Sequence, residues 1–314
     1  MEQPKKPSSE PTELPTKEGS WLPLVPYKNY WLEVHLAHNT MRVQESFQAR
    51  PDDTILATSP KCGTTWLKAL AFTIVNRSKH SFDEHPLLAQ HPQAVVPYIE
   101  MPADGRRDLS YIDEIPSPRL LATHLPLSLL PRSIAEQGCR IVYITRDPKD
   151  AFISTWHFKN KMHPRSFIGL DDAFDMFCDG FVNYGPCWEH TLEYWKESQA
   201  RPDGCLFFRY EEMMREPVEH VRKLAAFLGA PFTGEEEDAK LPEQVAKLCS
   251  FGNLAGLRVN QTGDFMRKED MVVEKSTFFR KGKVGDWRNY MDEEKGRKLD
   301  RISEEKFKGS GFAY

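Results

Sequence analysis

Three short apolar runs, each followed by a polar turn and a segment of helical spacing, constrain the fold of this chain most. They are Thr54–Thr58, Arg140–Thr145 and Cys205–Arg209. Buried parallel strands read as continuous apolar runs, and repeated strand–turn–helix units build a parallel sheet with helices on both faces. The sequence therefore predicts an α/β fold with a central, mostly parallel sheet flanked by helices. In such sheets ligands bind beyond the carboxyl ends of the strands, where the three polar turns lie.

The length of 314 residues leaves one or two domains open, so the division of the chain rests on its composition. Residues 1–19 are rich in Pro, Glu, Lys, Ser and Thr and contain little apolar sequence, which predicts a disordered tail. No internal repeat or Pro/Gly-rich linker follows, so we predict one domain over residues 20–314. Within it, residues 101–117 and 256–277 are predicted to be surface loops that act as lids.

Charge and cysteine usage exclude several classes of protein. The formal net charge of −4 argues against a dedicated nucleic-acid binder, because that class is usually basic. The N-terminal sequence has no apolar h-region, and no run of about 18 apolar residues occurs, so we expect neither a secretory signal nor a membrane span. The six cysteines form no CxxC pair and no metal-ligand spacing, which predicts reduced thiols in a cytoplasmic protein.

Residues 59–66 (SPKCGTTW) leave the first predicted strand and open a helix. Gly63 permits a tight turn, and the free N–H groups of the first helical turn attract an anion. Lys61 adds a positive charge, while Thr64 and Thr65 offer hydroxyls. The pattern also fits an ordinary strand–turn–helix junction with a threonine cap. A nucleoside-triphosphate loop of the form GxxxxGK[ST] is not present.

Two further segments have the composition of anion sites. Arg146 ends the second predicted strand, and Ser154 lies about two helical turns beyond it, so both can approach one phosphate. The alternative is a surface ion pair between Arg146 and Asp150. Near the C-terminus, residues 279–287 (FRKGKVGDW) combine three basic residues with two glycines, which let backbone N–H groups wrap an anion. Such a charge run also fits a solvated surface.

These three segments resemble the donor-binding motifs of the cytosolic sulfotransferases. SPKCGTTW resembles the family's YPKxGTTW loop, and FRKGKVGDW resembles its RKGxxGDW motif. The resemblance implies that the chain binds 3′-phosphoadenosine-5′-phosphosulfate (PAPS) without a metal ion. The implied donor-binding residues are Lys61, Cys62, Gly63, Thr64, Thr65, Trp66, Arg146, Ser154, Tyr210, Ser250, Phe251, Arg280, Lys281 and Gly282. The chain departs from the family pattern at Ser59, which replaces a tyrosine, and at Cys249, which replaces a threonine.

The segment 120–126 (LLATHLP) contains the candidate general base, His124. Histidine titrates near neutral pH and suits proton transfer from a hydroxyl, although a lone histidine in an apolar run is commonly a hydrogen-bonded core residue. ATHLP is similar to the family's THLP motif, which implies that His124 is the base and that Lys61 stabilises the leaving phosphate. Ala122 stands where the animal branch has a lysine, so other groups must replace that charge.

The acceptor side is less specific. Aromatic residues downstream of the second motif are candidates for an apolar pocket, and about half of them are expected to fill the core instead. They are Trp156, His157, Phe158, Tyr184 and Trp188. Residues 86–100 resemble the plant branch, which sulfates phenolics, flavonoids, steroid-like hormones and desulfoglucosinolates. The dimer signature of the animal branch is not matched after residue 287, so we expect a monomer.

Three other functions remain open from the residues alone. A kinase-like transferase would need a triphosphate loop and a metal carboxylate. A binding protein would keep the PAPS site without catalysis, although Lys61 and His124 are both present. An interaction module would not need polar residues at strand ends. The expected function is therefore sulfuryl transfer to a hydroxyl of a small, largely apolar molecule.

Overall fold

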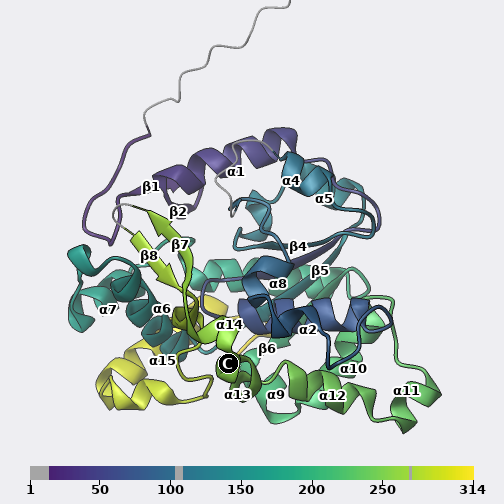
Figure 1. Cartoon of the computed structure of the whole chain (residues 1–314). Helices are drawn as coiled ribbons and strands as arrows, with labels where there is room; N and C mark the ends of the chain where they lie inside the picture. Colours follow the sequence, from purple (N-terminus) through teal and green to yellow (C-terminus); the bar gives the residue numbers. More distant parts are fainter. Residues whose placement is uncertain (1–13, 103–108, 269–270) are drawn as a thin grey trace, which may run out of the picture.

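The computed structural model describes residues 14–102, 109–268 and 271–314 (Figure 1). The strands are β1 (Leu24–Tyr27), β2 (Tyr30–Glu33), β3 (Thr54–Thr58), β4 (Leu120–Thr123), β5 (Arg140–Thr145), β6 (Cys205–Arg209), β7 (Asp264–Lys268) and β8 (Met271–Glu274). The α-helices are α1 (Val34–Ser46), α2 (Thr64–Asn76), α3 (Pro92–Val95), α4 (Ser110–Asp113), α5 (Arg132–Glu136), α6 (Pro148–Met162), α7 (Leu170–Cys178), α8 (Cys187–Ala200), α9 (Tyr210–Arg215), α10 (Pro217–Phe227), α11 (Gly234–Asp238), α12 (Leu241–Leu248), α13 (Phe251–Gly256), α14 (Arg258–Gln261) and α15 (Glu293–Phe307). Short 3₁₀ helices are η1 (Pro86–Leu88), η2 (Leu127–Leu129), η3 (Pro164–Ser166), η4 (Lys275–Phe278) and η5 (Asp286–Asn289).

The central sheet has four parallel strands in the order β4-β3-β5-β6. Ile55 of β3 lies opposite Leu121 of β4 and Ile141 of β5, and all five residues of β3 are buried. The predicted α/β fold with a mostly parallel sheet is therefore confirmed. Because the strands are parallel, their carboxyl ends meet at one edge of the sheet, and the three polar turns follow from there.

Helices cover both faces of this sheet (Figure 1). Ile55 and Ala57 point into a core shared with α1 and α8, whereas Leu56 points into a core shared with α2, α10 and α12. This alternation explains why the strand reads as continuously apolar, since each face of a strand presents every second side chain. A third core joins α6, α7, α8 and α15 through Phe152, Phe174 and other residues.

The segment 14–19 differs from the predicted disordered tail. Lys17 exchanges two backbone hydrogen bonds with Leu24 over 2.7 and 3.1 Å, and its ammonium lies 4.4 Å from the ring centre of Phe181. These contacts fix residues that composition alone assigned to the tail. Residues 1–13 lie outside the described part of the chain.

The segment 256–277, predicted to be a loop, contains α14, the antiparallel pair β7–β8 and most of η4. Its strands are four or five residues long and mix apolar with charged side chains, so their sequence signal is weak. In the other predicted loop, residues 110–113 form α4, and residues 103–108 lie outside the described chain.

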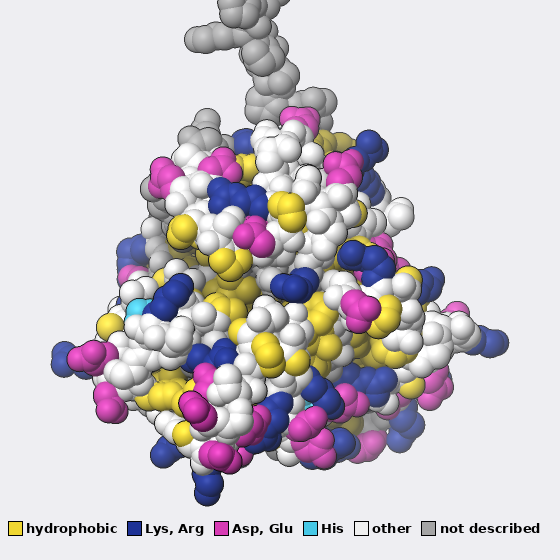
Figure 2. Space-filling view, turned by 90° about the vertical axis from the view of Figure 1, so that its right-hand side faces the viewer, with side chains coloured by type: hydrophobic (Ala, Val, Ile, Leu, Met, Phe, Trp, Pro, Cys, Tyr) yellow, Lys and Arg dark blue, Asp and Glu magenta, His cyan; other side chains and the backbone are white. Residues whose placement is uncertain are grey.

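A buried ion pair fastens the start of β4 to the start of β3. Arg119 donates from Nε and Nη2 to the two carboxylate oxygens of Asp53 over 2.8 and 2.6 Å, and neither side chain is exposed. The outer surface is different: on the face seen in Figure 2, Lys and Arg are interspersed with Asp and Glu. Throughout the described residues, every helix is too short or too polar to cross a membrane.

Candidate active site

One cavity of about 1550 Å³ gathers most of the predicted site residues beyond the carboxyl ends of the strands. The candidate donor-binding residues that line it, from the three anion motifs and from positions 210 and 250–251, are Lys61, Gly63, Thr64, Thr65, Trp66, Arg146, Ser154, Tyr210, Ser250, Phe251, Arg280, Lys281 and Gly282. The candidate base and two predicted acceptor residues line it as well: His124, Phe158 and Tyr184. Segments more than 200 residues apart in sequence therefore line one cavity, which is open to solvent on one side.

The loop between β3 and α2 has the backbone of an anion site. Lys61 and Gly63 have φ angles of 67° and 117°, and α2 begins at Thr64. A Cβ at Gly63 would lie 3.1 Å from the ring of Tyr210, so glycine allows both the turn and the close approach. The N–H groups of the first turn of α2 then face the cavity without helical partners. The N–H of Cys62 is engaged within the loop, because it donates to the carbonyl oxygen of Ser59 over 3.3 Å.

Three cations meet at this end of the cavity. Burial, together with the positive charges of Arg146 and Arg280, lowers the pKa of Lys61 to about 7. The Lys61 ammonium lies 3.8 Å from the ring centre of Phe158. The Nε atoms of both arginines are buried and have no hydrogen-bond partner among the described residues. A multiply charged anion fits this site, because it would neutralise the cations and accept from the free donors.

Asp150 connects the second and third anion motifs. Its carboxylate accepts from the N–H groups of Gly285 and Trp287 over 2.7 and 3.0 Å. Arg146 donates to the carbonyl oxygen of Lys283 over 2.8 Å and lies 3.6 Å from Asp150. The alternative of a surface ion pair is wrong, because the side chains of Arg146 and Asp150 are only 8% and 1% exposed. Asp150 instead anchors the glycine-containing loop beside α6, a role that its spacing alone did not indicate.

Aromatic rings form a wall beside the anion site. The rings of Trp66 and Tyr210 meet edge to face, with centroids 5.6 Å apart, and the indole Nε1 of Trp66 is buried without a described partner. Phe251 packs against Gly282, where an added Cβ would come within 2.3 Å of its ring. Ser250 caps α13 by accepting from the N–H of Asn253 over 3.3 Å. Such a wall suits a planar nucleobase that carries a hydrogen-bond acceptor for the Trp66 Nε1–H.

His124 follows β4 and presents one defined nitrogen to the cavity. Its Nδ1–H donates to the carbonyl oxygen of Thr58 over 2.8 Å, so Nε2 is left with its lone pair. The Tyr98 hydroxyl donates to Nε2 over 3.2 Å, and the backbone N–H of His124 donates to Glu100 over 2.7 Å. Burial lowers the pKa of His124 to about 3, although the bond to Thr58 opposes this. The imidazole is therefore neutral at physiological pH and can accept a proton.

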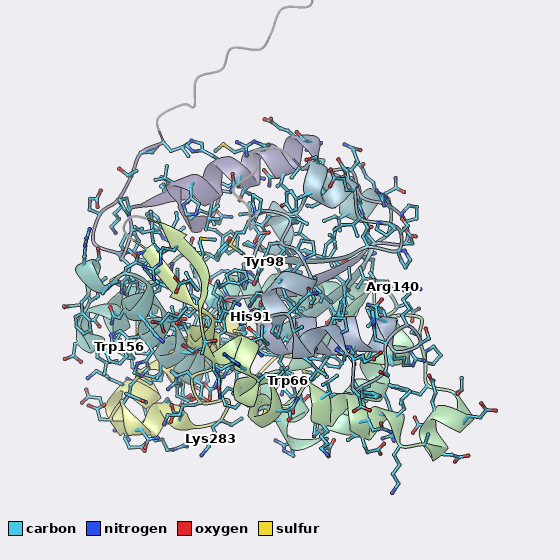
Figure 3. All side chains as sticks on the ribbon, in the orientation of Figure 1. Trp66, His91, Tyr98, Arg140, Trp156 and Lys283 are labelled. Carbon is cyan, nitrogen blue, oxygen red and sulfur yellow. The ribbon has the colours of Figure 1, made fainter. Side chains whose placement is uncertain are left out.

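Tyr98 and Glu100 were not singled out from the sequence. They lie on a segment that runs beside β4, where Tyr98 forms a parallel bridge with Ala122 (Figure 3). The alternation of polar and apolar residues in VPYIE was the available signal, since Tyr98 and Glu100, two residues apart, lie on the same face of an extended chain. In the sequence alone, this stretch indicated only a resemblance to the plant branch of the family.

The structure places the predicted acceptor residues in two different regions. Phe158 and Tyr184 line the cavity, whereas Trp188 is 1% exposed in the third core and donates from Nε1 to Ser303 over 2.9 Å. Trp156 packs in the same core and donates to the carbonyl oxygen of Ile168 over 2.9 Å, away from Tyr98 (Figure 3). Helical phase explains the difference, since Ser154 and Phe158 lie four residues apart on one face of α6. The other apolar lining includes Phe265, Met266, Met271, Val273 and Phe278, from β7, β8 and η4.

The described residues contain no group of three or more His, Cys, Asp or Glu side chains arranged to bind a metal ion. The six cysteines are all unpaired, as the sequence predicts. The thiol of Cys62 is buried behind the phosphate loop, and burial raises its pKa to about 12.

Comparison with known proteins agrees with this geometry. Residues 51–311 match the family described as the sulfotransferase domain. The chain is 43% identical to cytosolic sulfotransferase 17 of Arabidopsis thaliana, over 95% of this chain and 87% of that protein. It is 40% identical to the flavonol 4′-sulfotransferase of Flaveria chlorifolia, over 92% of this chain and 89% of that protein.

A solved structure of a mouse sulfotransferase complexed with PAP (adenosine 3′,5′-bisphosphate) is similar as well. It superposes with a TM-score of 0.69 at 26% identity, covering 92% of this chain and 95% of that one. The family match, the relatives and the site geometry agree, and the chain belongs to the PAPS-dependent cytosolic sulfotransferase family, in its plant branch.

Proposed function

We propose that this enzyme transfers the sulfuryl group of PAPS to a hydroxyl of a small, largely apolar acceptor, such as a phenolic, a flavonoid or a steroid-like metabolite, with His124 as the general base. One observation carries the proposal: the neutral Nε2 of His124 faces the same cavity as the three cations Lys61, Arg146 and Arg280. A base and an anion site within one cavity are what a group transfer to a hydroxyl requires.

At the donor end of the cavity, a separate set of residues would bind each portion of PAPS. The 5′-phosphosulfate would lie on the loop from Lys61 to Thr65 and the first turn of α2. The 3′-phosphate would lie between Arg146, Ser154 and the loop 280–282. The Nε atoms of Arg146 and Arg280 have no hydrogen-bond partner in the described part of the chain. The adenine would pack on the aromatic wall of Trp66, Tyr210 and Phe251. The PAP complex of the mouse relative supports this arrangement.

The reaction then needs two contributions from the chain. His124 accepts the acceptor's proton at Nε2 while the acceptor oxygen bonds to sulfur and the sulfur–oxygen bond to the 5′-phosphate breaks. Lys61 and the N–H groups at the start of α2 stabilise the negative charge left on the phosphate, a stabilisation that grows toward the transition state. The proton gained by His124 is released to water after the product leaves, so charge and atoms balance.

The acceptor would enter the apolar part of the cavity. Phe158 and Tyr184 lie beside the reacting groups, because Phe158 covers Lys61 and the ring of Tyr184 lies 5.5 Å from that of His124. A flavonol as acceptor of one relative supports a planar hydroxylated substrate. The chain is further proposed to act as a monomer in the cytosol and without a metal ion, and the names of the cytosolic relatives support that location.

The test is turnover of PAPS, in the presence of a chelator, with a panel of hydroxylated flavonoids, phenols and steroids. Mass spectrometry detects the product. We expect a product heavier by one sulfuryl group, and no product from acceptors whose hydroxyl is methylated. Absence of transfer to every acceptor, with PAP still bound, would indicate a binding protein. Transfer of phosphate from ATP that requires a divalent metal would indicate a kinase-like enzyme.

A further inference from the structure

Lys68, on the buried face of α2, is a charged residue that the proposed reaction does not use. Its side chain is completely inaccessible, and its Nζ has no hydrogen-bond partner among the described residues. An unpaired buried amine costs free energy, so a chain selected for stability alone would place an apolar residue here. The position on α2 is seven residues beyond Lys61, but Lys68 is not among the described residues that line the cavity.

The contact that Lys68 makes leads directly to the base. Its Nζ lies 3.4 Å from the ring centre of Tyr98, against the face of the phenol. The ring of Tyr98 in turn packs against the imidazole of His124, with centroids 5.1 Å apart and an angle of 40° between the planes. An N–H group directed at the face of an aromatic ring is attracted to it, and this attraction strengthens where water is excluded.

The remaining surroundings of Lys68 are also part of this cluster. Burial lowers the pKa of Lys68 well below its ordinary value, and the nearby Glu100 carboxylate opposes this shift only in part. The second oxygen of Glu100 is itself buried without a described partner. Glu100 accepts from the backbone N–H of His124 and from the Tyr184 hydroxyl over 2.7 and 3.3 Å. Two histidines also lie near Lys68, and a positive charge on Lys68 would disfavour the charged forms of His91 and His124.

We propose that Lys68 is a positioning residue for sulfuryl transfer: it fixes the ring of Tyr98, which fixes the imidazole of His124 with Nε2 toward the cavity. The hydrogen bond from Tyr98 to Nε2 is long at 3.2 Å, so an acceptor hydroxyl can replace it while the ring contact remains. Lys68 acts only through Tyr98 and touches neither donor nor acceptor. The proposal rests on the function proposed above.

The experiment is a double-mutant cycle between Lys68→Met and Tyr98→Leu. Methionine keeps the length of the lysine stem and removes the amine. We expect K68M to lower kcat about tenfold or more, because small displacements of a catalytic group are costly, while the KM values and the dissociation constant of PAP stay within about twofold. In the Y98L background, K68M should have no further effect on kcat, since the residue through which it acts is gone.

A matched control lies on the same helix. Thr73 is also a buried polar residue of α2, and its hydroxyl lies 3.4 Å from the Cys249 thiol, so Thr73→Val should leave kcat unchanged. An unchanged kcat in K68M, or an equal loss in the wild-type and Y98L backgrounds, would overturn the proposal. So would loss of PAP binding in both K68M and Lys68→Gln, because Lys68 would then be needed for folding. Failure of the proposed function is distinguishable, since the wild-type enzyme itself would then transfer no sulfuryl group.

Discussion

The Nδ1–H of His124 donates to the backbone carbonyl of Thr58, the last residue of β3, over 2.8 Å. The same residue begins the turn that becomes the phosphate loop, and its hydroxyl lies 2.6 Å from that of Thr64 at the start of α2. One strand end therefore fixes both the tautomer of the base and the position of the anion site. Any change that displaces this strand end would disturb both parts of the reaction together.

Replacement of His124 by alanine is predicted to remove the base while leaving the donor site intact. We expect kcat to fall by a factor of about 10² to 10⁴, with PAP affinity unchanged, because the anion motifs do not contact the imidazole. Steady-state kinetics and calorimetry measure the two quantities. The matched control is His220→Gln, a buried histidine of α10 outside the cavity whose Nδ1–H donates to the Glu216 carbonyl. Near-normal turnover in H124A would contradict the proposed role.

Binding of PAP is predicted to take up a proton at alkaline pH. Burial and the neighbouring arginines lower the pKa of Lys61 to about 7 in the free protein, so its amine is mostly neutral at pH 8. Bound phosphate favours the ammonium and raises that pKa, so close to one proton is absorbed at pH 8 and little at pH 6. Calorimetry in two buffers of different ionisation enthalpy measures the uptake. It should vanish in Lys61→Met and persist in Lys283→Met; uptake that survives in K61M would refute the assignment.

Gly282→Ala is predicted to weaken PAP binding. The residue has a φ of +59°, and an added Cβ would lie 2.3 Å from the Phe251 ring, so both the backbone and the aromatic wall must shift. Restoring the binding geometry against such strain costs about 1–3 kcal/mol, equivalent to a roughly five- to 150-fold loss of affinity. Gly256→Ala is the control, because its Cβ would meet no atom within 4 Å. Equal affinities for the two variants would show that the wall does not contact the nucleotide.

Asp53→Asn is predicted to destabilise the fold without touching the site. The substitution leaves the Arg119 guanidinium buried without its carboxylate, which costs about 3–5 kcal/mol in the free energy of unfolding. Urea denaturation measures the loss. The neighbouring Asp52 is exposed and accepts from the Ser117 hydroxyl, so Asp52→Asn should change stability by less than about 0.5 kcal/mol. A similar small effect in both variants would mean that the buried pair contributes little.

The donor site was predictable because its residues lie within motifs at strand ends. Arg146 and the phosphate loop follow β5 and β3, and parallel strands bring their carboxyl ends to one edge. Gly282 lies far from Arg146 and the phosphate loop in sequence, and only the motif around it indicated that it belongs to the same site. The way these parts are joined was not predictable, since Asp150 connects them through backbone N–H groups that carry no sequence signal.

The surroundings of the base and of the acceptor were harder to predict. Lys68 and Tyr98 act through contacts between α2 and an extended segment, and a single sequence shows no pairing between such distant residues. Trp156 and Trp188 were assigned to the acceptor pocket by residue type, but their positions on their helices direct both side chains into the third core. The apolar lining from β7 and β8 was missed because short strands with charged residues resemble a loop.

The central claim is that the loops at the edge of the sheet form a site for a nucleotide with a 3′-phosphate, and metal-free calorimetry tests it most directly. The wild-type protein and Arg146→Met would each be titrated with adenosine 3′,5′-bisphosphate, adenosine 5′-monophosphate and ATP. We predict that the wild type binds the bisphosphate at least about a hundredfold more tightly than the monophosphate, as bidentate charge-assisted contacts require, and that R146M loses this preference. Equal affinity of the wild type for all three nucleotides, or a preference that survives in R146M, would contradict the account.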